Sequence, residues 1–491
     1  MTGPSTNLEL NGTNVIDESE RGGKASSLFW PWCGANVSLL ALSYGSFFLG
    51  FGISFWQATL AALLGTVLSF LLVGFSSLAG KKSNAPTMVL ARATFGVKGA
   101  VIPGLLSYLV FVGWEIVLMS LATLATGTVF MRLGNLDQNT AMAIGFAIAI
   151  ALTVSAGVLG FAVIMRIQRI LTIVTLVMTG VYISLTFDEV NWSAITSLPS
   201  GNAQGFIGAI IFGATGIGLG WVNAAADYSR YLPSQTSSLK TFFAAGAGSV
   251  VGAQVAMILG VFAAAMSNGQ FAGHEVAYIV GLGGTGATAA LLYFSIAFGK
   301  VTISTLNSYG SFMCIATIIS GFRGHLQVSR LQRLVFVLVI VGAATLMALL
   351  GQHSFLGAFK SFILFLLAFF TPWSAINLVD YYCITRERYD VTALADPDGR
   401  YGRWNLLGIS VYVFGVLVQL PFISTKFYTG PLVAALGDVD ISWIIGLVLP
   451  AALYYVCAKK WHGSVPDQLI LPQGSVVQPK TSGNGRAAAQ A

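Results

Sequence analysis

The chain has 491 residues, of which 55% are hydrophobic and 9% are charged, whereas about 25% are charged in an ordinary soluble domain. Runs of about 20 apolar residues recur between positions 29 and 458, and each is long enough to cross the ~30 Å hydrocarbon core of a bilayer. These features exclude a soluble protein, and the net charge of +7 is spread over short loops rather than gathered in a surface for nucleic acid.

The polar ends of the chain flank a long apolar region. Residues 1–28 lack the basic-then-apolar pattern of a cleaved signal peptide, and the low-complexity tail 459–491 is expected to be disordered. Between them the apolar runs predict an all-α polytopic membrane protein with twelve transmembrane helices. The predicted spans are 29–53, 57–78, 101–130, 140–164, 170–187, 205–228, 241–266, 283–318, 334–351, 356–379, 406–424 and 441–458.

The basic residues predict the orientation of these spans. With the N-terminus inside, nearly all of the 25 Lys and Arg residues fall in cytoplasmic segments; Arg132, Lys360 and Lys426 fall outside, and Lys300 lies within a span. Positive charge concentrates on the cytoplasmic side of membrane proteins. We therefore expect a multi-pass protein of the plasma (inner) membrane with both termini in the cytoplasm.

The first and sixth spans are unusually rich in glycine and small polar residues. The sixth reads GAIIFGATGIGLGWVNAAADYSRY and the first contains ANVSLLALSYGSFFLGFG. The two lie five spans apart and therefore cross the membrane in opposite directions. Interrupted helices at corresponding places in oppositely oriented halves are typical of inverted-repeat transporters, although glycine also simply eases helix crossing.

The first, third, sixth and eighth spans carry the polar residues expected at membrane depth, whereas the second, fourth, fifth, ninth, eleventh and twelfth are nearly featureless. Glu115 stands beside Trp114, Trp221 lies two positions before Asn223, and the eighth span contains Lys300. An intramembrane charge marks function by default, but Glu115 and Lys300 also form a possible structural pair. Two interpretations of Glu115 therefore stay open, contact with a substrate or pairing with Lys300. The eighth span adds Ser304 and Asn307 to the candidate substrate-binding residues.

Five stretches in chain order resemble the nucleobase:cation symporter family, which includes cytosine, purine and hydantoin permeases. They are ARATFGVKGAVIP (91–103), ADYSRYLPS (226–234), TLNSYGSF (305–312), VDYY (379–382) and DPDGRYGRWN (396–405). The resemblance, closest to the purine–cytosine branch, implies a LeuT-like fold with five-plus-five inverted repeats. The implied units are a first repeat at 29–187, a second repeat at 205–379, a cytoplasmic loop at 380–405 and two further helices at 406–458.

The resemblance also implies that a flat substrate is stacked between aromatic side chains of the third and sixth spans. Trp114 matches the stacking tryptophan of the third span. In the sixth span, Gly218 matches the aromatic position of the hydantoin and cytosine permeases, whereas Trp221 resembles the tryptophan of the fungal-type branch. The family often has Gln or Asn four residues after the first tryptophan, and this chain has Leu118 there.

A coupling-ion region between the first and eighth spans is implied by the same resemblance. The family's sodium ligands map onto Ala35 and Ser38 in the first span, and onto Gly299 and Thr302 in the eighth, with one hydroxyl missing at Ile303. Lys300 stands among them, and its ammonium could take the volume and charge of Na⁺. This hypothesis favours H⁺ over Na⁺ as the coupling ion.

We therefore expect secondary active uptake of a purine or pyrimidine nucleobase by proton- or sodium-coupled alternating access, with the choice of coupling ion open. The carrier is expected to be a monomer in the lipid bilayer and to need no cofactor. A permease for allantoin, a hydantoin or a vitamin is the alternative, and the choice of base stays open. An intramembrane enzyme is disfavoured because the histidines lie in loops or the tail and no paired acidic motif occurs. A channel is disfavoured because no repeated filter-like segment is visible. The histidines are His274, His325, His353 and His462.

Overall fold

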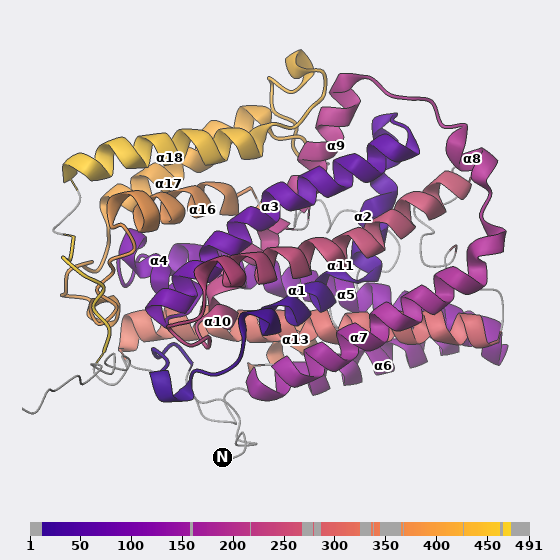
Figure 1. Cartoon of the computed structure of the whole chain (residues 1–491), viewed down its shortest axis with the longest axis horizontal. Helices are drawn as coiled ribbons and strands as arrows, with labels where there is room; N and C mark the ends of the chain where they lie inside the picture. Colours follow the sequence, from indigo (N-terminus) through magenta and orange to yellow (C-terminus); the bar gives the residue numbers. More distant parts are fainter. Residues whose placement is uncertain are drawn as a thin grey trace, which may run out of the picture.

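The computed structural model describes residues 12–157, 161–216, 218–267, 278, 286–324, 335–336, 338–343, 365–366, 368–425, 427–461 and 465–472. Long helices run side by side along the length of this part of the chain (Figure 1). The helices of the first half are α1 (Phe29–Asn36), α2 (Leu39–Phe47), α3 (Phe55–Ser83), α4 (Thr87–Phe95), α5 (Val101–Gly134), α6 (Gln138–Gly157), α7 (Phe161–Thr186) and α8 (Trp192–Thr196). Those that follow are α9 (Ala203–Gly216), α10 (Ala225–Ser229), α11 (Ser238–Met266), α13 (Ala287–Arg323), α16 (Phe370–Leu378), α17 (Leu406–Gln419) and α18 (Ser442–Trp461).

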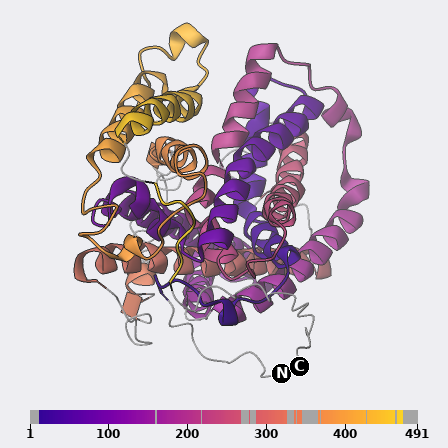
Figure 2. The same cartoon turned by 60° about the vertical axis from the view of Figure 1, so that its left-hand side comes forward.

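Short 3₁₀-helices and one π-helical segment join several of these elements. They are η1 (Glu18–Glu20), η2 (Ala25–Leu28), η3 (Phe48–Phe51), η4 (Phe187–Glu189), η5 (Gly218–Ala224), η7 (Ala393–Ala395), η8 (Leu420–Phe422), η9 (Ala434–Leu436) and the π-helical segment η6 (Val379–Ile384). The C-terminal helices α16, α17 and α18 pack together. Drawn in orange and yellow, they gather on one side of the bundle (Figure 2).

The length and composition of the described helices fit a polytopic membrane protein. Six can cross a bilayer: α3, α5, α7, α9 continued through α10, α11 and α18. A seventh candidate span consists of two helical pieces, 25–36 and 41–51, bent by 62° at a short break. α13 is longer than any of these, with 37 residues, and coincides with the predicted eighth span. The predicted span 334–351 is described only at residues 335–336 and 338–343, and the predicted span 356–379 only at 365–366 and 368–379, where α16 lies.

The boundary between the predicted fourth and fifth spans is wrong. α6 ends at Gly157 and α7 has begun by Phe161, so the expected loop around residues 164–170 is helical. Arg166 and Arg169 lie in the first turns of α7, and the guanidinium of Arg169 lies 5.7 Å from the centre of the Trp30 ring. Because the long stem of arginine lets its charged head reach the membrane surface from a helix end, these charges did not mark a loop.

Both polar ends of the chain contain described segments that are bonded to the bundle. We call residues 12–24 the N-terminal strap. Its Ile16 exchanges hydrogen bonds with Asn84 at the end of α3, and its Glu18 accepts the Ser234 N–H at 2.9 Å. Near the other end, the backbone of Ile470 bonds residues 389 and 391 at 2.9 Å each. This stretch, 465–472, therefore differs from the disordered tail that was expected.

Candidate functional site

The first predicted span is broken at its middle, as its composition predicted. Val37 leaves the helical conformation and Ser38 is extended, and the Ser38 side chain caps α2 by accepting the N–H of Ala41 at 3.2 Å. A helix end leaves carbonyl oxygens without intrahelical partners. One of these, on Gly34, accepts the hydroxyl of Thr302 from α13 at 2.8 Å. The break therefore joins the first span to the eighth.

The sixth predicted span is interrupted as well. α9 ends at Gly216, the chain winds tightly through η5, and α10 completes the span. At Gly218 an added Cβ atom would lie 2.0 Å from the Ser69 hydroxyl of α3. Glycine at this position therefore permits close packing of η5 on α3, and the candidate substrate-binding position Gly218 lies against a helix backbone.

The interrupted segment η5 also carries Trp221 and Asn223. The Trp221 ring lies edge-on to the buried Trp32, with 5.8 Å between ring centroids, and 6.4 Å from the ring of Phe111. Asn223 is 1% exposed, and neither atom of its amide has a hydrogen-bond partner among the described residues. Burial of an amide without hydrogen bonds costs about 1–3 kcal/mol of stability. The amide of Asn223 therefore offers one donor group and one acceptor to a ligand.

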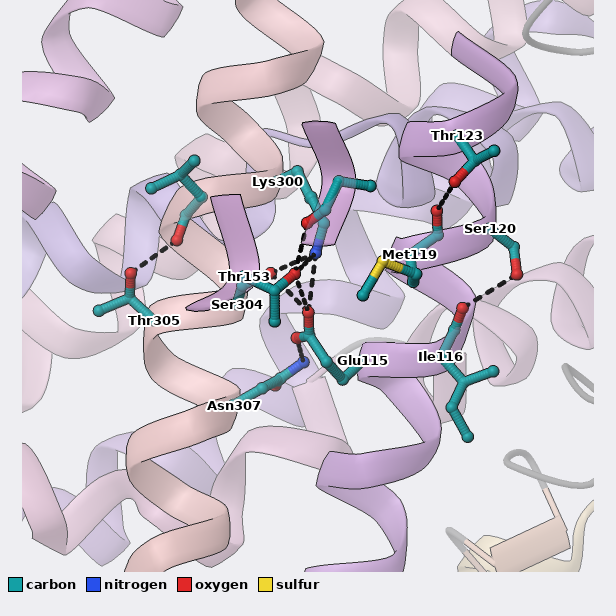
Figure 3. Close-up of polar contacts among 12 residues, drawn as sticks. Glu115, Ile116, Met119, Ser120, Thr123, Thr153, Lys300, Ser304, Thr305 and Asn307 are labelled. Atoms are coloured by element: carbon teal, nitrogen blue, oxygen red, sulfur yellow. Dashed lines mark hydrogen bonds and ion pairs between the residues drawn. The ribbon is translucent and has the colours of Figure 1, made fainter. Parts of the chain in front are cut away.

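Glu115 and Lys300 form a buried ion pair between α5 and α13 (Figure 3). The ammonium of Lys300 lies 2.7 Å from the Oε1 atom of Glu115, and neither side chain is more than 3% exposed. The two helices pack along much of their length, and α6 packs against both. Pairing with Lys300 was one of the two interpretations of Glu115. Burial of either charge alone would carry a large desolvation cost, so each one stabilises the other.

Two hydroxyl groups complete the surroundings of the ammonium. Ser304 Oγ lies 2.6 Å from Lys300 Nζ and donates to Glu115 Oε1 at 2.8 Å. Thr153 Oγ1 of α6 lies 2.8 Å from Nζ and 3.1 Å from Oε1. An ammonium has three N–H donors and no acceptor, so Glu115, Thr153 and Ser304 together satisfy it.

The two oxygens of the Glu115 carboxylate have unequal surroundings. Oε1 faces Lys300, Ser304 and Thr153 at 2.7–3.1 Å. Oε2 accepts the amide of Asn307 at 3.5 Å, the limit of a hydrogen bond. Each carboxylate oxygen can accept about two hydrogen bonds, so Oε2 keeps capacity for a further donor. Pairing with Lys300 and contact with a ligand are therefore compatible, because they use different oxygens.

The candidate coupling-ion residues meet where α13 crosses the break in the first span. A Cβ atom on Gly299 would lie 2.9 Å from the carbonyl oxygen of Val37, so α13 approaches the break closely. The Thr302 hydroxyl reaches the carbonyl oxygens of Gly34 and Gly299, at 2.8 and 2.7 Å. Ala35 is buried beside this contact.

The Lys300 ammonium points away from the region between the first and eighth spans, where it was expected to take the place of Na⁺. Its three hydrogen bonds go to Glu115 on α5, to Thr153 on α6 and to Ser304 on its own helix. Successive helical residues are turned by about 100°, so positions 300 and 302 face nearly opposite sides of α13. The carboxylate of Glu115 therefore draws the ammonium to the side away from Thr302.

The remaining candidates of the third span have apolar surroundings. Trp114 is half-buried against the main hydrophobic core, and Leu118, one turn later, is 4% exposed within it. Leu118 has no group that can hydrogen-bond to a ligand, whereas Glu115, one turn earlier on α5, has a carboxylate. The residues between which a flat ligand is expected to stack, Trp114 and Trp221, lie on α5 and η5 respectively.

Thr153 is a contributor that the sequence did not single out. Its span was read as featureless, and threonine hydroxyls in helices commonly bond the carbonyl four residues back. Thr123 and Thr305 do this at 2.9 and 2.7 Å (Figure 3). Thr153 does so too, with Ala149 O at 2.9 Å, and also reaches the ion pair. No signal in one sequence separates it from the others.

No group of three or more His, Cys, Asp or Glu residues that could hold a metal ion occurs within the described residues. The four histidines all lie outside those residues. The structure brings the carboxylate of Glu115, the ammonium of Lys300 and hydroxyl and amide groups together between α5, α6 and α13, whereas the amide of Asn223 lies on η5. Such a set recognises a polar small molecule by hydrogen bonds.

Known proteins resemble the chain over most of its length. The family model described as permease for cytosine/purines, uracil, thiamine and allantoin matches residues 15–446. The putative purine-cytosine permease YxlA of Bacillus subtilis is 33% identical over 457 residues, covering 92% of this chain and 96% of that protein. The purine-cytosine permease fcyB of Emericella nidulans is 24% identical over 93% of this chain and 89% of its own.

The fold is similar to that of solved transporters. Mhp1, a nucleobase-cation-symport-1 family transporter in a closed conformation with bromovinylhydantoin bound, superposes with a TM-score of 0.70 at 19% identity. The match covers 93% of this chain and 97% of that one. A manganese transporter of Eremococcus coleocola gives a TM-score of 0.53 at 15% identity, over 92% of this chain and all of that one. These likenesses concern the fold.

Proposed function

The chain belongs to the family of permeases for cytosine/purines, uracil, thiamine and allantoin, and we propose that it carries a purine or pyrimidine nucleobase across the membrane by alternating access. It is a transporter of the helical membrane class and not an enzyme. Two relatives, one bacterial and one fungal, bear the name purine-cytosine permease, which favours a nucleobase over the other substrates in the family description.

The base is proposed to lie between Trp114 of α5 and Trp221 of η5. Aromatic faces suit a flat heterocycle, and stacking gives affinity with little selectivity. The observation that carries the proposal is the buried Asn223 amide, which lies two residues from Trp221 without a hydrogen-bond partner among the described residues. A nucleobase edge offers adjacent donors and acceptors, and the amide of Asn223 offers both.

Glu115 is proposed to read a second edge of the base. Its Oε2 atom has spare capacity to accept an N–H group, and Asn307 lies beside it at 3.5 Å. An edge atom left unsatisfied in a buried site costs about 1–3 kcal/mol, so fixed polar groups of this kind can set selectivity. Stacking on the two tryptophans thus supplies most of the affinity. Hydrogen bonds from Asn223, Glu115 and Asn307 supply the specificity.

We propose that transport is coupled to H⁺ or Na⁺, and we favour H⁺ because the Thr302 hydroxyl already lies against carbonyl oxygens in the region where the family's sodium ligands map. The ammonium of Lys300 is held by Glu115, Thr153 and Ser304 between α5, α6 and α13, so it does not take the place of Na⁺ between the first and eighth spans. In the region where the family's sodium ligands map, the hydroxyl of Thr302 bonds carbonyl oxygens of Gly34 and Gly299. A bound Na⁺ would have to compete with these bonds.

The architecture proposed for this function has twelve spans, with inverted repeats at 29–187 and 205–379 and two further helices at 406–458. The two interrupted spans, at α1–α2 and at α9–η5–α10, support it because they occupy the first position of each repeat. Nearly all Lys and Arg residues then face the cytoplasm, together with both termini, in a plasma (inner) membrane protein. The functional unit is proposed to be a monomer.

Competition for uptake tests the proposed substrate class. Cells that express the chain would be given labelled cytosine or adenine, together with an excess of unlabelled cytosine, adenine, guanine, hypoxanthine, uracil, allantoin or a hydantoin. Strong inhibition by one or more nucleobases is expected. Stronger inhibition by allantoin or a hydantoin than by any nucleobase would favour the alternative substrate class, and absence of uptake for both labelled bases would contradict the proposal.

A further inference from the structure

Thr153 links α6 to the buried ion pair through a single hydroxyl group. We propose that Thr153 is a positioning residue of the substrate site, which keeps the Lys300 ammonium on Oε1 of Glu115 and leaves Oε2 available to the substrate. The inference rests on the proposed function, because it assigns Oε2 to a base. Thr153 is fully buried, and its contacts join α6 to both α5 and α13.

The hydrogen-bond geometry gives the Thr153 hydroxyl a definite role. A hydroxyl has one hydrogen to donate and two lone pairs that accept. The hydrogen of Thr153 can be taken by the carbonyl of Ala149 in its own helix, 2.9 Å away. A lone pair then accepts an N–H of Lys300, whose Nζ atom lies at 2.8 Å. Because threonine is stiff at χ1, the backbone of α6 fixes the position of this acceptor.

The other two acceptors of the ammonium cannot replace Thr153. Ser304 and Glu115 Oε1 each already take one N–H of Lys300, at 2.6 and 2.7 Å. If the Thr153 hydroxyl is removed, the third N–H needs a new acceptor. Glu115 Oε2, with its long contact to Asn307, has spare capacity within this cluster. The ammonium would then bridge both carboxylate oxygens and occupy the group that the substrate requires.

Three variants separate this role from a structural one. Thr153→Val removes the hydroxyl at nearly constant shape, and Thr153→Ser retains it. Thr175→Val of α7 is the matched control, because Thr175 is also buried and its hydroxyl has no hydrogen-bond partner among the described residues. Uptake of labelled cytosine or adenine, whichever the unmodified protein carries, would be measured against substrate concentration, with folded protein quantified by size-exclusion chromatography.

We expect Thr153→Val to raise the apparent KM about tenfold, equivalent to ~1.4 kcal/mol, with a much smaller change in the maximal rate per folded transporter. Thr153→Ser and Thr175→Val should keep an apparent KM close to that of the unmodified protein. An unchanged KM in Thr153→Val, or a loss confined to the amount of folded protein, would overturn the inference. If the valine variant does not fold, Thr153→Cys replaces it, because a thiol is a weak acceptor. Absence of uptake by the unmodified protein would instead contradict the proposed function.

Discussion

The ammonium of Lys300 lies 2.7 Å from Oε1 of Glu115, deep between α5 and α13, while Oε2 of the same carboxylate has, among the described residues, a single 3.5 Å hydrogen bond, from Asn307. This division explains how one residue can serve the fold and the substrate. One oxygen neutralises a buried cation, and the other can accept hydrogen bonds from a ligand.

Removal of one charge from the pair should damage the fold more than removal of both. An unpaired buried charge typically costs about 3–5 kcal/mol, whereas replacement of a whole pair by uncharged residues is often tolerated. We expect Glu115→Gln and Lys300→Met each to lower the thermal unfolding temperature in detergent. The double variant should recover most of that loss, and a double variant less stable than both single variants would contradict the pairing.

Asn223 should contribute to uptake rather than to stability. Its amide is buried without a hydrogen-bond partner among the described residues, so Asn223→Leu removes an unsatisfied polar group. We expect an unfolding temperature equal to or above that of the unmodified protein. The apparent KM for the carried base should rise about 5- to 150-fold, equivalent to the ~1–3 kcal/mol of a buried hydrogen-bonding group. An unchanged KM would remove Asn223 from the site.

Gly218 should behave as a packing residue. A Cβ atom there would lie 2.0 Å from Ser69 Oγ, so Gly218→Ala forces η5 away from α3. Overpacking of this kind costs about 1–3 kcal/mol. The added change Ser69→Gly should restore thermal stability and uptake together. If Gly218 instead contacts the substrate, the double variant would regain its stability and keep a raised KM.

Docking of the N-terminal strap should depend on Glu18. Burial tends to raise the pKa of its carboxyl, but hydrogen bonds from Ser234 and the charge of Arg21 outweigh this, and the pKa lies below the ordinary value of 4.5. A lowered carboxyl pKa in the folded state stabilises the docked form at pH values above 4.5, and this contribution is lost as the pH falls through the lowered value. The charged groups beside Glu18 are Arg21 and, through Arg21, Lys81.

Hydrogen exchange of the strap amides, followed from pH 7 down to pH 3, measures this dependence. After correction for intrinsic exchange, protection should stay constant between pH 5 and pH 7. It should decrease at pH values below about 4.5, the ordinary pKa of the carboxyl group. Glu18→Gln should remove that pH-dependent step. The exposed carboxylate of Asp137, in the loop between α5 and α6, supplies the control variant Asp137→Asn. A step that survives in Glu18→Gln would assign the pH dependence to another group.

Composition and local pattern predicted much of the fold, because each membrane-spanning helix must itself be long and apolar enough to cross the bilayer. The interruptions at α1–α2 and at η5 followed from glycine and small polar residues, and Gly218 proved necessary for the approach to α3. Arg166 and Arg169 misled the assignment of a loop, because basic residues near helix ends reach the membrane surface from within a helix.

The candidate site was harder to predict than the fold, because it depends on which side chains meet in space. Glu115 and Lys300 stood out as charges at membrane depth, yet their pairing and its use of one carboxylate oxygen required coordinates. Lys300 was expected beside Thr302, but a two-residue offset on a helix turns it to the other side. Thr153 was indistinguishable in sequence from other helix-bonded threonines, and only the crossing of α6 with α5 and α13 brings it to the ion pair.

Binding of labelled cytosine and adenine to the purified protein tests the central claim most directly, with the Glu115→Gln/Lys300→Met variant compared with the unmodified chain. The double change removes both charges together, so the fold should persist while Oε2 is lost as a carboxylate acceptor. We predict saturable binding of at least one base to the unmodified protein and a loss of affinity of about tenfold or more, equivalent to ~1.4 kcal/mol, in the folded double variant. Equal affinity in the two proteins would contradict the assignment of Glu115 to the substrate.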